Sequence, residues 1–269
     1  MKKIIFTIAI ILVFISCRSG KRNLLARDIE LWENMEVWDF AKCISKRRFE
    51  EAERLLVQKH IDVDYKEPKF GETLLSWAVL NDNVEAVKFL VDHGANPNSH
   101  NTYNGESPMT DAAGDFNSVE ILRYLLLHGG NPNDYVKENE VLTNGRSIKT
   151  PLIAAAFISL EKTKMLVEAG GDANFAVEPG YTAFYYATLR LKKDVLDYLI
   201  SNCGFDYKKT YIVTLDTGDT LYLKELLEKD KVSHRQDSIT VKRILDYIDE
   251  EIIGTDFDSV SKGDRGTVP

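Results

Sequence analysis

Apolar side chains in the middle of the chain recur at the spacing of short amphipathic helices. Val87, Phe89 and Leu90 fall on one face of such a helix. Similar apolar runs follow at residues 125–127, 165–167 and 195–200. Before each run stands a segment with one to three alanines, whose small side chains let two helices approach closely. The pattern therefore predicts successive pairs of short helices packed against one another.

The helix pairs share their boundaries, which marks them as an internal repeat. The first helix of each pair begins at a hydroxyl residue, namely Thr73, Ser107, Thr150 or Thr182. Such a residue caps a helix by accepting backbone N–H bonds, and a proline at the first helical position, as at Pro108 and Pro151, sacrifices no hydrogen bond. The second helix ends at a glycine that supplies left-handed backbone, namely Gly94, Gly129, Gly170 or Gly204.

These segments resemble the ankyrin repeat, whose period is about 33 residues and whose signature includes Thr-Pro-Leu-His-x-Ala. The resemblance implies an all-α ankyrin-repeat solenoid, with helix-turn-helix units joined by hairpins or loops. It implies about four full repeats, at residues 67–100, 101–135, 146–176 and 177–206. Residues 31–66 and 207–253 are interpreted as degenerate caps, which would extend the repeat domain over 31–253.

The outer segments complete this division of the chain. Trp32 and Trp38 are expected to seal the N-terminal cap. In the C-terminal cap, two amphipathic helices are expected at Thr220 to Lys229 and Ser238 to Ile253. Residues 254–269 are expected to form a flexible tail.

The sequence departs from the ankyrin pattern in three ways. The histidine of the signature is replaced by Ser76, Thr110, Ile153 and Tyr185. The glycine between the helices is replaced near Asp82, Ser159 and Leu191. Since a left-handed non-glycine residue costs roughly 1–2 kcal/mol, we expect those turns to be reshaped. Extra residues at 134–149 predict an extended finger.

The N-terminus has the pattern of a bacterial secretion signal. Lys2 and Lys3 precede an apolar run over residues 4–15, which is too short to span a bilayer. The following Phe-Ile-Ser-Cys resembles a lipobox, which implies a signal peptide at 1–16, lipidation of Cys17 and a tether at 17–30. An uncleaved anchor and ordinary secretion are the alternatives.

The predicted anchor gives the chain an expected location. We expect a protein of the cell envelope that is attached to a membrane through its lipid. Arg18 stands where an aspartate would retain a lipoprotein at the inner membrane, so we expect the outer membrane, facing the periplasm.

Charge and composition bear on the partner. The formal net charge is −8, which argues against nucleic acid, because a nucleic-acid-binding protein must neutralise phosphates. An acidic surface is compatible with a basic protein partner or with solubility alone. Cys43 and Cys203 fall about four repeats apart, so no disulfide is expected between them.

The sequence contains no recognisable catalytic motif. It lacks the HExxH, P-loop and G-x-S-x-G patterns and any Cys/His cluster at metal spacing. His60, His93 and His128 fall at the ends of second helices, where a structural role is expected. His100 falls on a hairpin and could contact a partner. We therefore expect no enzyme activity, cofactor, metal site or small-molecule substrate.

The resemblance implies a concave face, built from hairpin tips and first helices, that grips a partner protein. Carried over position by position, it predicts these partner-binding residues: Lys69, Phe70, Glu72, Asn81, Tyr103, Asn104, Glu106, Asp115, Arg146, Lys149, Glu178, Tyr181 and Arg190. Aromatic and arginine side chains suit interface hot spots, although Phe70 and Tyr181 could equally pack against neighbouring hairpins. The 134–149 finger is either a partner contact or tolerated length.

Three functions fit these features. The leading hypothesis is an envelope-anchored adaptor that binds one protein through its concave face. A narrower version is an immunity protein that neutralises a secreted toxin in the periplasm. The contrasting hypothesis is an accessory subunit that protects an envelope enzyme.

Overall fold

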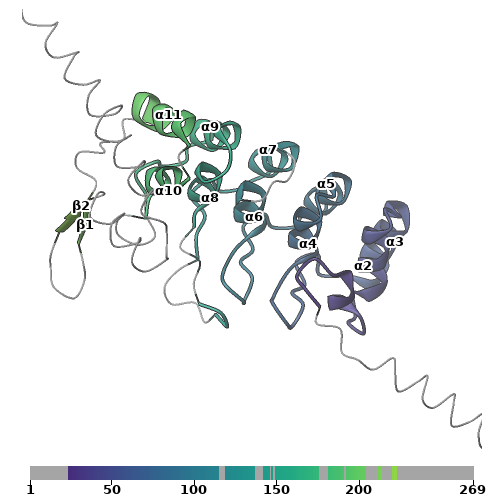
Figure 1. Ribbon diagram of the computed structural model, residues 1–269. Coiled ribbons are helices and arrows are strands. Elements are labelled where there is room, and N and C mark those ends of the chain that lie inside the picture. Colours follow the sequence, from purple (N-terminus) through teal and green to yellow (C-terminus); the bar gives the residue numbers. More distant parts are fainter. Residues whose placement is uncertain are drawn as a thin grey trace, which may run out of the picture.

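The computed structural model shows a row of helix pairs stacked side by side (Figure 1). It describes residues 24–114, 119–136, 142–145, 147, 149–175, 181–190, 192–203, 211–213 and 220–222. The predicted signal peptide, Cys17 and the predicted tail at 254–269 lie outside the described residues. Within the described part of the chain, no helix is long and apolar enough to cross a membrane.

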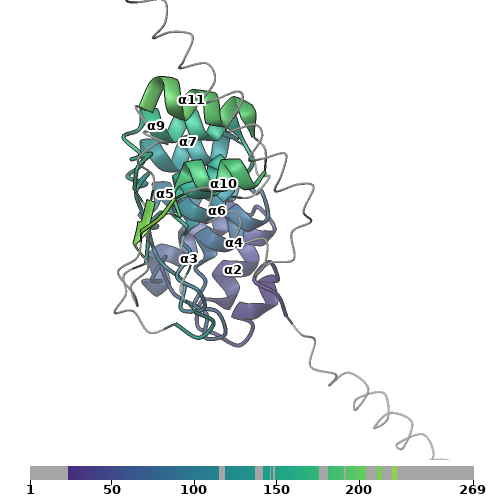
Figure 2. The same ribbon diagram turned by 60° about the vertical axis from the view of Figure 1, so that its left-hand side comes forward.

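The helices form two layers that run the length of the stack. The first layer contains α2 (Trp38–Ser45), α4 (Leu74–Leu80), α6 (Pro108–Gly114), α8 (Pro151–Ala156) and α10 (Ala183–Leu189). The second layer contains α3 (Phe49–Lys59), α5 (Val84–Asp92), α7 (Val119–Leu127), α9 (Leu160–Glu168) and α11 (Lys193–Cys203). Each helix contacts its partner in the pair, and from α4 onward each also contacts the next helix of its own layer (Figures 1 and 2). This is the predicted ankyrin-repeat solenoid.

Hydroxyl side chains begin the first helices, as the sequence predicts. Thr73 Oγ1 accepts a hydrogen bond from the Ser76 N–H at 3.1 Å, and Thr150 Oγ1 accepts one from the Ile153 N–H at 3.2 Å. Ser107 and Thr182 make the same bond in their repeats. The start of each repeat is therefore determined locally, by a side chain that accepts a hydrogen bond from a backbone N–H with no partner inside the helix.

Small buried side chains hold the two layers together. The predicted alanines Ala78, Ala112, Ala155 and Ala187 are all fully buried. Aliphatic residues of the second layer, such as Val87 and Leu90, complete a single apolar core. Cys43 is buried in this core, and both Cys43 and Cys203 are free thiols, which confirms that they form no disulfide.

The turns show which of the missing glycines matter. Gly94, Gly129 and Gly170 have φ between 92° and 95°, which confirms their left-handed conformation at the ends of second helices. Asp82 keeps a left-handed φ of 50°, so the expectation of a reshaped turn is wrong there. Ser159 is extended and instead caps α9 by accepting from the Lys162 N–H, so that turn is reshaped. Gly204 and Leu191 lie outside the described residues.

Side chains in the connecting loops link each repeat to the next. Asn98 accepts a bond from the Asn131 N–H and donates its amide to Gly129 O, at 2.8 and 2.9 Å. Asn133 makes the equivalent pair of bonds to the Asp172 N–H and Gly170 O. These bonds fix the spacing of the hairpins along the stack.

One part of the C-terminal prediction is wrong. Thr220–Tyr222 form β2, which pairs antiparallel with β1 (Tyr211–Val213) in register Ile212↔Leu221. A helix had been expected to begin at Thr220, but threonine, valine, isoleucine and tyrosine favour extended backbone. The remainder of the two predicted helices, at 223–229 and 238–253, lies outside the described residues.

Candidate functional site

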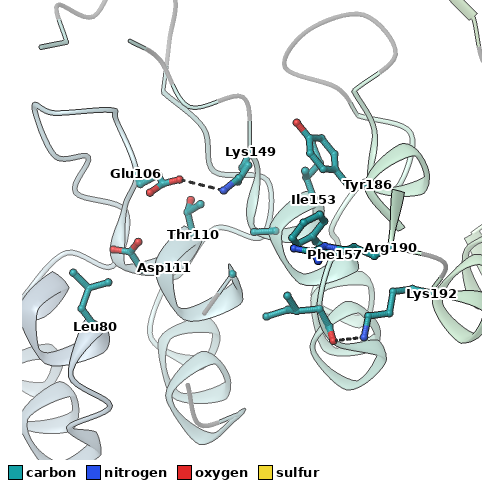
Figure 3. Close-up of a pocket in the computed structure, with 13 residues that line it drawn as sticks. Leu80, Glu106, Thr110, Asp111, Lys149, Ile153, Phe157, Tyr186, Arg190 and Lys192 are labelled. Atoms are coloured by element: carbon teal, nitrogen blue, oxygen red, sulfur yellow. Dashed lines mark hydrogen bonds and ion pairs between the residues drawn. The ribbon is translucent and has the colours of Figure 1, made fainter. Parts of the chain in front are cut away.

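A groove of about 580 Å³ opens along the first-layer helices (Figure 3). Its walls come from the end of α4 and from α6, α8 and α10, together with residues that flank these helices on either side. Ile153, Ala154 and Phe157 supply apolar surface at α8, between polar residues of the neighbouring repeats. Four consecutive repeats therefore build one hollow, which no single repeat could form alone.

The α6 side of the groove carries acidic groups. Asp111 projects from α6, and Glu106 precedes that helix (Figure 3). Lys149 reaches across from the next repeat, with its Nζ 3.9 Å from Glu106 Oε1. The Lys149 side chain is half exposed, so water screens this pair and its contribution to stability is small.

The α10 side carries an arginine stacked on an aromatic ring. The Arg190 guanidinium carbon lies 4.1 Å from the centroid of the Phe157 ring, a cation–π distance. Tyr186 meets the same ring edge-on, with centroids 6.2 Å apart. Nearby, Lys192 Nζ donates to Ile158 O at 3.0 Å (Figure 3). Phe157 thus holds the arginine in place at the surface.

The structure brings three of the predicted partner-binding residues together in this groove. These are Glu106, Lys149 and Arg190, which come from two hairpins and a turn. Tyr181 lies outside the lining, where it is half-buried and packs edge-on against Tyr185. Asp115, Arg146 and Glu178 lie outside the described residues.

Sequence reasoning missed Phe157 and Tyr186. Asn81, Asp115 and Arg190 each lie eight residues after the hydroxyl cap of their repeat, whereas Phe157 lies seven residues after Thr150. The same rule applied to the third repeat gives Ile158, which also lines the groove, and does not give Phe157. Tyr186 sits inside the first helix of its repeat, where nothing in the sequence distinguishes groove from core.

Two predicted residues at the first full repeat bind the chain's own N-terminal segment. Asn81 Nδ2 donates to Arg27 O at 3.2 Å, and Trp77 Nε1 donates to the same oxygen at 3.0 Å. Lys69 Nζ donates to Leu24 O. The segment leads into η2 (Ile29–Trp32), where Trp32 is fully buried, as the prediction of a sealed cap requires. The N-terminal segment therefore covers this part of the face.

Glu72 is buried, so the prediction that it lies on the binding surface is wrong. Only 5% of the residue is exposed, and its Oε1 accepts a hydrogen bond from Asn101 Nδ2 at 2.9 Å. Glu67 is also buried and accepts bonds from the N–H groups of Phe70 and Glu72. Burial, assisted by the nearby Glu67 carboxylate, raises the pKa of Glu72 to about 7. Glu72 organises a hairpin and does not face a partner.

We expect Glu72→Gln to change how stability depends on pH. Because the folded pKa of about 7 exceeds the ordinary value of 4.5, folding favours the protonated acid. Stability is then lost as pH rises through about 7, and the glutamine variant escapes that loss. At pH values above the folded pKa of about 7, the glutamine variant should have a free energy of unfolding roughly 1–3 kcal/mol higher than the wild type. This advantage should shrink as the pH falls towards the ordinary pKa of 4.5. Urea unfolding across this pH range measures it; parallel profiles for the two proteins would contradict it.

The hairpin tip of the second full repeat is occupied by the finger that follows it. The N–H groups of Thr143, Asn144 and Ser147 donate to the carbonyls of residues 102, 103 and 104, at 2.7 to 3.1 Å. The Tyr103 ring also packs edge-on against Phe70. The described part of the finger therefore lies against Tyr103 and Asn104, and the packing alternative holds for Phe70.

His93, His128 and His100 have structural partners. His93 and His128 end second-layer helices, and each donates from Nδ1 to a carbonyl one turn earlier, at 2.7 and 2.8 Å. His100 Nε2 lies 3.1 Å from Asp134 Oδ1, and Asp134 also accepts from Ser107. With the carboxylate between the other two groups, the histidine cannot activate the serine. In the described ranges, no three His, Cys, Asp or Glu residues are grouped as metal ligands.

Comparison with known proteins agrees with this architecture. Residues 41–136 match the family model for ankyrin repeats, in three copies. The crystal structure of EF0377, an ankyrin repeat protein, aligns with a TM-score of 0.54 and 25% identity, covering 79% of this chain and 98% of that one. Palmitoyltransferase AKR1 of Lachancea kluyveri is 27% identical over 167 residues, which is 58% of this chain.

These likenesses define the class of protein. The chain carries ankyrin repeats arranged as an ankyrin-repeat solenoid, a fold that generally mediates protein–protein interaction and is typically a non-catalytic binding module. The match covers 20% of the length of palmitoyltransferase AKR1, so it says nothing about the transferase activity of that protein here.

Proposed function

We propose that the protein is an envelope-anchored adaptor that binds one partner protein in the groove along α6, α8 and α10. The observation that carries the proposal is the stacked pair Arg190 and Phe157 at the open face of this groove. Arginine is among the side chains that most often dominate binding energy, and phenylalanine is enriched at the buried centres of protein interfaces.

Intramolecular contacts support this choice of surface over the other predicted positions. Lys69 and Asn81 bind the N-terminal segment, and the tip at residues 102–104 binds the finger. The groove is the part of the face where predicted residues from different repeats meet around open space. A partner would therefore contact Glu106, Lys149 and Arg190 together.

We also propose that lipid on Cys17 holds the adaptor at a membrane, with the outer membrane facing the periplasm as the expected site. The sequence pattern at residues 1–17 supports this part of the proposal. More than one acyl chain is needed for durable attachment, and lipidation at a lipobox cysteine adds several.

Affinity capture of the full-length chain from detergent-solubilised envelopes tests the proposal. We expect a protein that is retained by the wild type and by Lys164→Glu, which changes a cation on the second-layer helix α9. The same protein should be lost with Arg190→Glu. Both lysine and arginine sit over aromatic rings, Tyr198 and Phe157, so the two substitutions remove comparable contacts. Equal retention by both variants would overturn the groove as the binding surface.

The immunity-protein version is favoured by one observation, the formal net charge of −8, which suits a basic toxin. The same capture decides it. A captured protein that kills cells lacking this chain, and spares cells that contain it, would make the adaptor an immunity protein. A captured partner that is harmless in cells lacking the chain would exclude this version.

A further inference from the structure

The groove is electrically polarised from one end to the other. Glu106 and Asp111 stand at the α6 end, whereas Arg190 and Lys192 stand at the α10 end (Figure 3). Between them, the half-buried Phe157 ring gives apolar surface. A ligand that matches this order has a negative group at the α10 end and an apolar side chain next to it.

The cations of the groove differ in whether another group of the protein already pairs with them. Lys149 faces the Glu106 carboxylate, and Lys192 donates to the Ile158 carbonyl. Arg190 is exposed, and within the described residues no carboxylate forms an ion pair with it. Arg190 is therefore the cation that a ligand's negative group would meet.

Stacking on Phe157 prepares Arg190 for such a group. The guanidinium carbon lies over the ring, 4.1 Å from its centroid, and the N–H donors of a guanidinium lie in its own plane. A planar fork of donors matches the two oxygens of a carboxylate, and the stack lowers the conformational entropy lost on binding. A carboxylate that pairs with these donors would lie beside the Phe157 ring.

The size of the groove fits a short stretch of extended chain. Neighbouring helices lie roughly 8–10 Å apart, so the path from α6 over α8 to α10 is about 20 Å. Extended chain rises about 3.3 Å per residue, which makes that path roughly six residues long. A cavity of about 580 Å³ accommodates a few side chains of such a segment.

We propose that the groove recognises an extended segment of the partner protein in which an acidic residue stands next to a large apolar one. The carboxylate pairs with Arg190, and the apolar side chain packs against Phe157 and Tyr186. This inference rests on the proposed function and names the chemistry that the partner must display.

Fluorescence anisotropy of labelled six-residue peptides with the full-length chain in detergent micelles tests the inference. The probes share a central phenylalanine and differ only in the neighbouring residue, which is glutamate, glutamine or lysine. At low ionic strength we expect the glutamate peptide to bind about tenfold more tightly than its uncharged glutamine isostere. The lysine peptide should bind more weakly than both, and added salt should reduce these differences.

Variants assign the charge preference to one side chain. Arg190→Gln should abolish the difference between the glutamate and glutamine peptides, whereas Lys164→Gln should preserve it. Binding of none of the three peptides, a preference for lysine, or an unchanged preference in Arg190→Gln would each overturn the inference. If capture finds an Arg190-dependent partner but the peptides show no charge preference, the inference fails and the proposed function stands. If the peptides show the Arg190-dependent charge preference but capture finds no Arg190-dependent partner, the peptide specificity stands and the proposed adaptor function fails.

Discussion

Gly105→Ala is expected to lower the free energy of unfolding by about 3 kcal/mol, by combining backbone strain with overpacking. Gly105 has a φ of +78°, a left-handed conformation that alanine adopts only at a cost. A Cβ atom on this residue would also stand 2.5 Å from Val136 Cβ, in the next hairpin. Val136 is buried and cannot yield easily, so both penalties apply together.

Gly94→Ala is the matched control for this prediction. Gly94 has a similar φ of +93°, but nothing lies within 4 Å of the place where its Cβ would be. Its loss should therefore be the strain alone, roughly 1–2 kcal/mol. Urea unfolding followed by far-ultraviolet circular dichroism measures both variants. Equal losses would mean that the contact between these two hairpins contributes nothing.

Lys162→Met is expected to lower the free energy of unfolding by about 2 kcal/mol, because it leaves a buried carbonyl without its charged donor. Lys162 is 2% exposed, and its Nζ donates to Ala112 O at 2.7 Å. Ala112 lies in the last turn of α6, where the helix dipole presents partial negative charge. The ammonium group thus ties α9 to the helix of the preceding repeat.

Methionine keeps the apolar stem of the lysine and removes its charge, which separates packing from hydrogen bonding. Lys164→Met, two residues further along α9 and exposed, should change the stability by less than about 0.5 kcal/mol. Burying an ammonium group also carries a desolvation cost. If that cost dominates, Lys162→Met will be as stable as the wild type, and the capping role of Lys162 will be refuted.

The sequence was sufficient for features that depend on neighbouring residues. A hydroxyl group three residues before a backbone donor makes Thr73 or Thr150 a helix cap in almost any surroundings. A glycine after an amphipathic run ends a helix for a similar local reason, as at Gly94. Four repetitions of such signals identified the solenoid.

Features that depend on contacts between distant segments could not be read in this way. Asn81 and Lys69 have the polarity of surface residues, but they bind carbonyls 54 and 45 residues earlier in the chain. Glu72 looks like a typical exposed acid until Asn101 and Glu67 enclose it. The segments that fold across the concave face determine which of its positions stay accessible to a partner.

The same distinction applies to the groove. Glu106, Lys149 and Arg190 were predicted separately from their places in each repeat, and the stacking of the repeats brings them to one hollow. The cation–π contact between Arg190 and Phe157 joins two repeats, and no pattern within a single repeat encodes it.

Site-specific photo-crosslinking tests most directly whether the groove holds the partner. The Phe157→p-benzoylphenylalanine variant of the full-length chain places the reactive group in the groove, whereas Leu127→p-benzoylphenylalanine places it on α7, where Leu127 is 75% exposed. Irradiation in intact cells should give one defined protein adduct from position 157 and none from position 127. An adduct from position 127 alone, or the same adducts from both positions, would contradict binding in the groove.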